Sequence, residues 1–131
     1  MEFTDMTKAS ALYNFFSSFG INAYEETLVP TGEEAPKFPY LTYQLVTDSF
    51  DNEVLIPVSL WYRSEASLLA LNTKTEEISQ RIGRGGVFLD CDGGKIWLKR
   101  GSPFAQTMGD DADKTIKRKY INITAEFLTA D

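Results

Sequence analysis

Histidine is absent from this 131-residue sequence, and cysteine occurs once, at Cys91. Without histidine the chain lacks the commonest general base and the commonest neutral metal ligand. A single cysteine excludes an internal disulfide bond and fits a reducing compartment better than an exported one. The opening Met1–Met6 has neither a basic start nor an apolar run, and no stretch approaches the ~20 apolar residues of a membrane span. We therefore expect a soluble protein made inside the cell and not bound to a membrane.

The sequence has fewer basic than acidic residues, with 13 Lys and Arg and 19 Asp and Glu, which gives a net charge of -6. A nucleic-acid-binding protein usually gathers Lys and Arg on one surface. The basic run Lys117–Lys119 is short and is typical of the solvated start of a strand. We expect no specific nucleic-acid binding. A hydrophobic fraction of 43% can fill one core, so residues 1–131 are most simply a single domain.

The segment 40–63 organises the rest, because two long apolar runs flank the turn-forming pair Asp51-Asn52. A two-residue turn at this pair predicts one long β-hairpin. The predicted core-facing pairs are Leu41 with Tyr62, Tyr43 with Leu60, Leu45 with Val58, Thr47 with Ile56, and Ser49 with Val54. The predicted pairs on the other side are Tyr40 with Arg63, Thr42 with Trp61, Gln44 with Ser59, Val46 with Pro57, and Asp48 with Leu55. Because that second side carries aromatic and aliphatic residues, it needs a cover from a helix, a strand or another subunit.

Apolar residues at spacings of three and four predict two helices. The first spans Asp5–Ser18, with Thr4 or Asp5 as its cap and Gly20 after its end. The second follows a cap at Ser64 and stops at 83–86, GlyArgGlyGly. Its predicted buried stripe is Leu68, Leu71, Thr75, Ile78 and Ile82. The glycines end a helix, whereas a phosphate loop precedes one, so we interpret them as a stop signal.

Four further strands are predicted. A short one spans Ile21–Val29, where Glu25 and Glu26 point to opposite faces and are best interpreted as solvated. A hairpin spans Val87–Lys99 through the turn Asp92-Gly93, pairing Asp90 with Lys95 and Phe88 with Trp97, and leaving Cys91 as an unreactive thiol on the apolar side. The last strand, Ile116–Leu128, is expected to pair with the central hairpin and to turn Ile121, Ile123, Ala125 and Phe127 inward. Pro57 marks an edge or a bulge, because proline lacks a backbone donor.

Two segments are predicted to be loops. The proline-rich segment Pro30–Pro39 is a plain surface loop or a semi-rigid arm that contacts a neighbour. The polar segment Arg100–Thr115 contains two apolar residues, Phe104 and Met108. Apolar side chains in a long loop are often buried against a partner protein. Its acidic cluster is Asp110, Asp111 and Asp113. Their spacing does not match a calcium loop, so a solvated acidic loop is favoured over a cation site.

These elements predict an α+β fold in the order α-β-β-β-α-β-β-β, with two helices on one face of a single antiparallel or mixed β-sheet. The candidate interface residues are Tyr40, Trp61, Phe104 and Met108. No residue is assigned to catalysis, to a cofactor or to a metal.

Three stretches taken together, 60–64, 77–86 and 99–123, carry a family resemblance. The first is LeuTrpTyrArgSer, the second ends in ArgIleGlyArgGlyGly, and the third begins LysArgGlySerProPhe. The chain resembles the tail-terminator, or tail-completion, minor tail proteins of long-tailed phages and prophages. The resemblance implies a virion tail subunit, made in the host cytoplasm, that forms a homo-oligomeric and usually hexameric ring. It also implies the tail tube protein and head-tail connector proteins as partners, and no enzymatic activity or cofactor. An acidic subunit suits a channel through which DNA slides, because like charges repel.

Two other interpretations stay open. A non-catalytic protein-protein adaptor could use the Trp61 face to bind one partner. A metal-dependent hydrolase using the acidic cluster is the least favoured, because function is argued from sites and no site is visible in the sequence.

Overall fold

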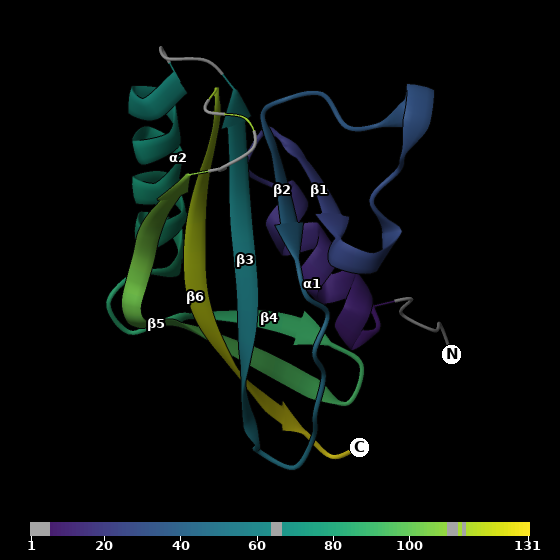
Figure 1. Cartoon of the computed structure of the whole chain (residues 1–131). Coiled ribbons are helices and arrows are strands. Elements are labelled where there is room, and N and C mark those ends of the chain that lie inside the picture. The colour runs from purple at the N-terminus through teal and green to yellow at the C-terminus, as the bar shows by residue number, and fades with distance from the viewer. Residues whose placement is uncertain (1–5, 64–66, 110–112, 114) are drawn as a thin grey trace.

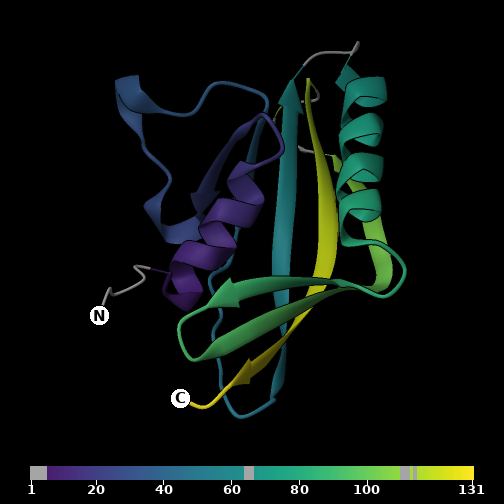
Figure 2. The ribbon, with the colours of Figure 1, turned by 180° about the vertical axis from the view of Figure 1, so that it is seen from behind.

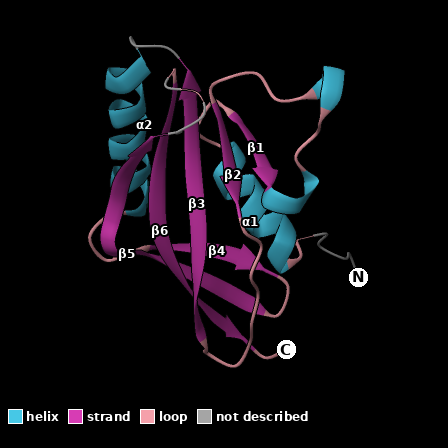
Figure 3. Ribbon diagram, in the orientation of Figure 1, coloured by secondary structure: helices cyan, strands magenta, loops and turns pink. Residues whose placement is uncertain are grey.

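The computed structural model describes residues 6–63, 67–109, 113 and 115–131. In chain order the elements are α1 (Lys8–Ser17), β1 (Asn22–Glu25), the 3-10 helices η1 (Glu26–Leu28) and η2 (Gly32–Glu34), β2 (Tyr40–Tyr43), β3 (Glu53–Arg63), α2 (Ser67–Ile82), β4 (Val87–Cys91), β5 (Gly94–Gly109) and β6 (Ile116–Thr129) (Figures 1 and 3). The predicted α+β class is confirmed. The order of elements differs in detail because two 3-10 helices follow the first strand.

One six-stranded sheet runs in the order β1-β2-β3-β6-β5-β4. β1 and β2 are parallel and every other neighbouring pair is antiparallel, so the sheet is mixed. Both helices cover the same face of the sheet, which is turned toward the viewer in Figure 2. We call the opposite face, which carries Leu55, Ser59 and Trp61 of β3, the open face.

The core lies between the two helices and the inward residues of the two long central strands. On β6 the predicted inward set is confirmed, since Ile121, Ile123, Ala125 and Phe127 are all fully buried. The helices supply Leu12, Phe16, Leu71, Ile78 and Ile82. Leu68 was predicted to be buried but is 44% exposed, because α2 begins at the end of the sheet and its first turn has little to pack against.

The ends of both helices are set by local chemistry. The Thr7 side chain caps α1 by accepting a hydrogen bond from the Ser10 backbone N–H at 3.0 Å. The predicted caps Thr4, Asp5 and Ser64 lie outside the described residues. The predicted stops are confirmed, since Gly20 and Gly83 have φ values of 81° and 77°.

The central hairpin is present, but its predicted register is wrong by two residues. Tyr40 pairs with Trp61 and Leu41 with Leu60, because the turn is centred on Phe50-Asp51 instead of Asp51-Asn52. Both turn residues have positive φ, 57° and 67°, and Asn52 N–H donates to Ser49 O at 3.1 Å. A shift of two residues keeps each β2 side chain on its predicted face.

The first strand of this hairpin is shorter than predicted. Gln44 N–H donates to Pro57 O at 3.0 Å, but Pro57 has no N–H with which to return the bond, so the ladder ends and β2 stops at Tyr43. The chain then leaves the sheet. As a result Val46 packs against the core instead of lying on the open face, and Leu45, predicted to be in the core, is 38% exposed.

Residues 100–109 belong to strand β5, so the predicted polar loop Arg100–Thr115 is wrong over these residues. β5 continues to Gly109, but its pairing with β6 is irregular. Arg100 pairs with Ile123 and Ala105 pairs with Ile121, so an advance of five residues along β5 matches an advance of only two along β6. Asn122 Nδ2 donates to Pro103 O at 2.8 Å and holds the bulged segment against β6. The glycine and proline that suggested a loop therefore form a β-bulge inside a long strand.

The second hairpin has the predicted register. Asp90 pairs with Lys95 and Phe88 with Trp97 around the turn Asp92-Gly93. The last strand is confirmed as Ile116–Thr129, and it pairs with β3 along the whole length of that strand.

Candidate interaction surfaces

Three of the four predicted interface residues lie in one row across the open face. The register pairs Tyr40 with Trp61, Trp61 with Arg118, and Arg118 with Met108, so that β2, β3, β6 and β5 each contribute one side chain. We call Tyr40, Trp61, Arg118 and Met108 the aromatic row. Arg118 was not predicted as part of a site, because the basic run 117–119 was interpreted as solvated.

The aromatic row is held together by its own contacts. Trp61 stacks on Tyr40 with ring centroids 6.0 Å apart and 13° between the ring planes, and the Arg118 guanidinium lies 4.8 Å from the centre of the Trp61 ring. The Trp61 indole N–H donates to Thr42 Oγ1 at 3.0 Å. Arg118 Nε donates to Ser59 Oγ at 3.0 Å.

These contacts change the character of the open face. Trp61 and Tyr40 are half-buried within the row, and burial raises the pKa of the Tyr40 hydroxyl, against the opposing charge of Arg63. The face is therefore less apolar than the sequence suggested. Its exposed apolar side chains include Leu55 and Met108.

Of the acidic cluster, Asp113 lies just before the start of β6, and Asp110 and Asp111 are outside the described residues. Asp113 accepts hydrogen bonds from Thr115 Oγ1 at 2.6 Å and Thr115 N–H at 2.9 Å, and it pairs with Arg63 at 3.2 Å. The Thr115 bonds, with help from Arg63, hold the pKa of the Asp113 carboxyl below its usual range. Within the described part of the chain, no group of three or more His, Cys, Asp or Glu side chains could hold a metal ion.

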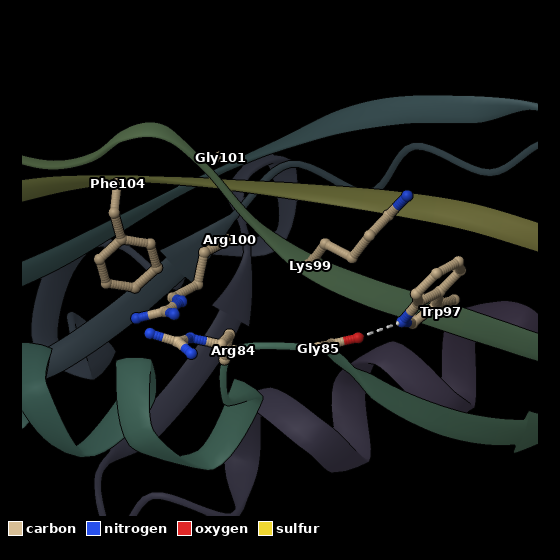
Figure 4. A pocket seen from close by; sticks show the side chains of 7 residues that line it. All are labelled: Arg84, Gly85, Trp97, Lys99, Arg100, Gly101 and Phe104. Atoms are coloured by element: carbon tan, nitrogen blue, oxygen red, sulfur yellow. Dashed lines mark hydrogen bonds between the residues drawn. The ribbon is translucent and has the colours of Figure 1, made fainter.

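Phe104 lies apart from the aromatic row. It is partly buried and packs against the core, instead of extending from a flexible loop. With residues of the α2–β4 turn and of β5 it lines a cavity of about 480 Å³, which we call the basic pocket (Figure 4). The pocket is lined by Arg84, Gly85, Trp97, Lys99, Arg100, Gly101 and Phe104.

A third surface, around α1, was missed in the sequence. Tyr13, Leu28 and Leu45 are exposed and line a groove of about 670 Å³ between α1, β1 and the end of β2. The outward residues of α1, such as Tyr13 and Asn14, carry no charge, whereas α2 carries Lys74, Glu76, Glu77 and Arg81. We call this groove and the outward side of α1 the uncharged α1 surface, after the composition of the helix; Glu25 is the one carboxylate among the residues that line the groove.

Hydrogen bonds fix the walls of this groove. The Glu25 carboxylate accepts from Thr27 N–H at 2.8 Å and from Leu45 N–H at 3.4 Å, so it ties η1 to the segment that follows β2. The side-chain hydrogen bond from Thr27 is the main reason why the pKa of Glu25 is lowered. Lys8, the charged residue of α1, donates to Asp48 O at 2.7 Å, so its charge is directed away from the groove.

The sequence signal for this surface was the composition of the helix. Only Lys8 is charged in Lys8–Ser17, although a surface helix normally carries charges on its solvent side. Of the apolar residues at helical spacing in this segment, Leu12, Phe16 and Phe19 lie in the core as the spacing predicts, but Tyr13, which the same spacing places on the buried stripe, is 49% exposed and lines the groove.

The comparisons with known proteins leave the chain without an assigned family. The sequence matches no protein-family model, and the comparison with curated proteins gives no match. Neither of the two helices described here is long and apolar enough to cross a lipid bilayer.

Proposed function

We propose that this chain is a structural subunit of a phage or prophage tail, which assembles with copies of itself into a ring at the head-proximal end of the tail tube. In this role it terminates the tube and joins it to the head connector. The sequence resemblance in 60–64, 77–86 and 99–123 supports the tail assignment. The uncharged α1 surface carries the self-assembly part of the proposal.

The composition of that surface is typical of the centre of a protein-protein interface. Such centres are depleted in charged residues and enriched in aromatic ones, and contiguous exposed apolar groups commonly mark an interaction site. Tyr13, Leu28 and Leu45 meet these criteria within one groove. The groove also borders β1, an edge strand of the described sheet whose one strand partner is β2.

A ring with more than two subunits needs two different surfaces on each subunit, because each contact is heterologous. The uncharged α1 surface lies on the helical side of the sheet, and Leu55 and Met108 are exposed on the open face. Apolar groups on two sides of the subunit are compatible with cyclic assembly. They favour it over an adaptor that binds with one face.

The test is the assembled mass, measured by native mass spectrometry and light scattering, with and without the tail tube protein. We expect a closed oligomer for the wild-type chain and loss of that oligomer in Leu28→Asp. Leu69→Asp is the matched control, because Leu69 is 78% exposed and Leu28 is 74% exposed, but Leu69 lies in the first turn of α2, away from the groove. A wild-type monomer under both conditions contradicts the proposal, as does a Leu28→Asp oligomer of unchanged mass. A monomer that binds the tube protein one to one supports the adaptor instead.

A further inference from the structure

We infer that the basic pocket receives the side chains of Glu33 and Glu34 from a second copy of this chain, which makes it one half of the contact between neighbours. The inference rests on the proposed self-assembly and names a charged contact within it. It combines a pocket with uncompensated positive charge and an exposed acidic turn on the other side of the same subunit.

The positive charge of the pocket comes from two arginines. Arg84 extends from the turn after α2 and Arg100 from the start of the β5 bulge, and their guanidinium groups lie side by side next to Phe104 (Figure 4). Arg100 Nη1 donates to Ser79 Oγ at 2.9 Å, which orients it. Within the described residues Arg84 makes no ion pair, and no carboxylate lines the pocket.

Lys99, the third cation of the pocket, is already neutralised. It pairs with Glu53 and with Glu126, each at 3.2 Å. The two arginines are therefore the free charges of the pocket, and they attract an anion to it although the chain as a whole carries a net charge of -6. Guanidinium groups bind carboxylates through paired, charge-assisted hydrogen bonds, so two of them side by side suit two adjacent carboxylates.

Two adjacent carboxylates are available in η2. Residues 31–35 are all exposed, and in the described part of the chain Glu33 and Glu34 have no hydrogen-bond or ion-pair partner. Pro30, Pro36 and Pro39 limit the conformations of this segment, so little ordering is lost when it binds. This favours the semi-rigid arm over the plain surface loop for Pro30–Pro39.

The positions of the arm and the pocket require two copies. In Figure 1 the arm extends from the upper right of the molecule, whereas the end of α2 and the bend of β5 lie at the lower left. The acidic turn therefore cannot fill the pocket of its own chain. A contact between unlike surfaces on opposite sides of a subunit is the heterologous kind that closes a ring.

A charge exchange tests the contact, with assembly followed by native mass spectrometry over a range of concentrations. We expect Arg84→Glu with Arg100→Glu, and separately Glu33→Arg with Glu34→Arg, to raise the concentration needed for half assembly by at least about tenfold. The chain with all four substitutions should assemble as the wild type does, because the charges are exchanged. Glu76→Arg, at an exposed carboxylate on α2, is the control for a charge reversal away from the arm and should have little effect.

The outcomes separate this inference from the proposed function. If the wild-type chain assembles and both double variants assemble equally well, the contact is wrong and self-assembly stands. If the double variants fail and the fourfold variant fails while still folding, as judged by circular dichroism, the pairing is also wrong. If inorganic phosphate binds the pocket without affecting assembly, the pocket takes a free anion instead. A wild-type chain that does not assemble overturns both proposals.

Discussion

The Arg118 guanidinium lies 4.8 Å from the centre of the Trp61 ring, and on the side of the neighbouring strand β2 the same ring stacks on Tyr40. A cation held over a half-buried aromatic ring stabilises the fold by more than it would at a fully exposed site. Arg118 also donates to Ser59 Oγ, so it links two strands of the open face. The aromatic row therefore contributes to the stability of the sheet.

We expect Arg118→Met to lower the free energy of unfolding by about 1–2 kcal/mol, because it removes the cation and one hydrogen bond but keeps a long apolar side chain. Urea denaturation measures the change. Ser59→Ala removes only the hydrogen bond and should have the smaller effect. Equal losses in the two variants would show that the cation contributes nothing.

Two neighbouring glycines are expected to respond very differently to alanine. Gly86 has φ of 86°, and a Cβ atom there would lie 2.6 Å from Leu98 O and would also collide with the Trp97 indole nitrogen. We expect Gly86→Ala to destabilise the fold by more than about 2 kcal/mol. Gly85 has open space around its Cα, so Gly85→Ala should change stability by less than about 1 kcal/mol. Thermal unfolding of the two variants checks this, and similar melting temperatures would refute it.

The register of the central hairpin could not be predicted from the local sequence. Asp51-Asn52 has the composition of a two-residue turn, yet the turn uses Phe50-Asp51, and nothing in local propensity favours a phenylalanine with positive φ. Tertiary hydrogen bonds account for it, since Phe50 N–H donates to Thr129 O and Asp51 N–H to Phe127 O. Contacts to residues more than 70 positions away were invisible in the sequence.

The turn gives a prediction about strain. Phe50 is 69% exposed and has φ of 57°, so replacing it removes little buried surface. Asparagine tolerates this conformation far better, and we expect Phe50→Asn to raise the free energy of unfolding by about 0.5–1 kcal/mol in urea denaturation. Phe50→Ala keeps most of the strain and serves as the control. If alanine stabilises as much as asparagine, backbone strain is not the cause.

Patterns of alternation and helical spacing predicted the two helices, the second hairpin and the last strand, because these depend on which residues are buried. The long strand β5 was missed because Gly101 and Pro103 interrupt it, and a β-bulge uses the same residues as a loop. Of the predicted interface residues, the sequence placed Tyr40 and Trp61 on the correct face. The pairing of Met108 with Arg118, and the separate position of Phe104, depend on the bulge and could not be foreseen.

The Glu25 carboxylate lines the groove, and its hydrogen bonds make the free energy of unfolding depend on pH. Its folded-state pKa lies below the ordinary value of 4.5, chiefly through the hydrogen bond from Thr27, so its stabilisation is present at neutral pH and is lost as the pH falls through the folded-state pKa. We expect Glu25→Gln to lower the free energy of unfolding by about 0.5–1 kcal/mol at pH 7 and by nothing measurable once Glu25 is protonated in the wild type. Glu26→Gln at the next, exposed position is the control. A difference that does not depend on pH would contradict this assignment.

The last prediction concerns the thiol of Cys91. Because Cys91 is the only cysteine, any alkylation of a thiol in this chain reports on this residue. Burial raises the pKa of the Cys91 thiol, Lys8 opposes this, and the carboxylates of Asp92, Asp90 and Asp131 add to the increase. The thiolate fraction at neutral pH is then smaller than in a free cysteine, so we expect iodoacetamide to react several-fold more slowly with the folded chain than with the chain in denaturing urea. The rate should increase with pH through a midpoint above the ordinary thiol value. Lys8→Gln removes the one opposing charge and should move that midpoint higher still. A midpoint below the ordinary value would mean that Cys91 is an activated thiol, contrary to its interpretation as an unreactive one.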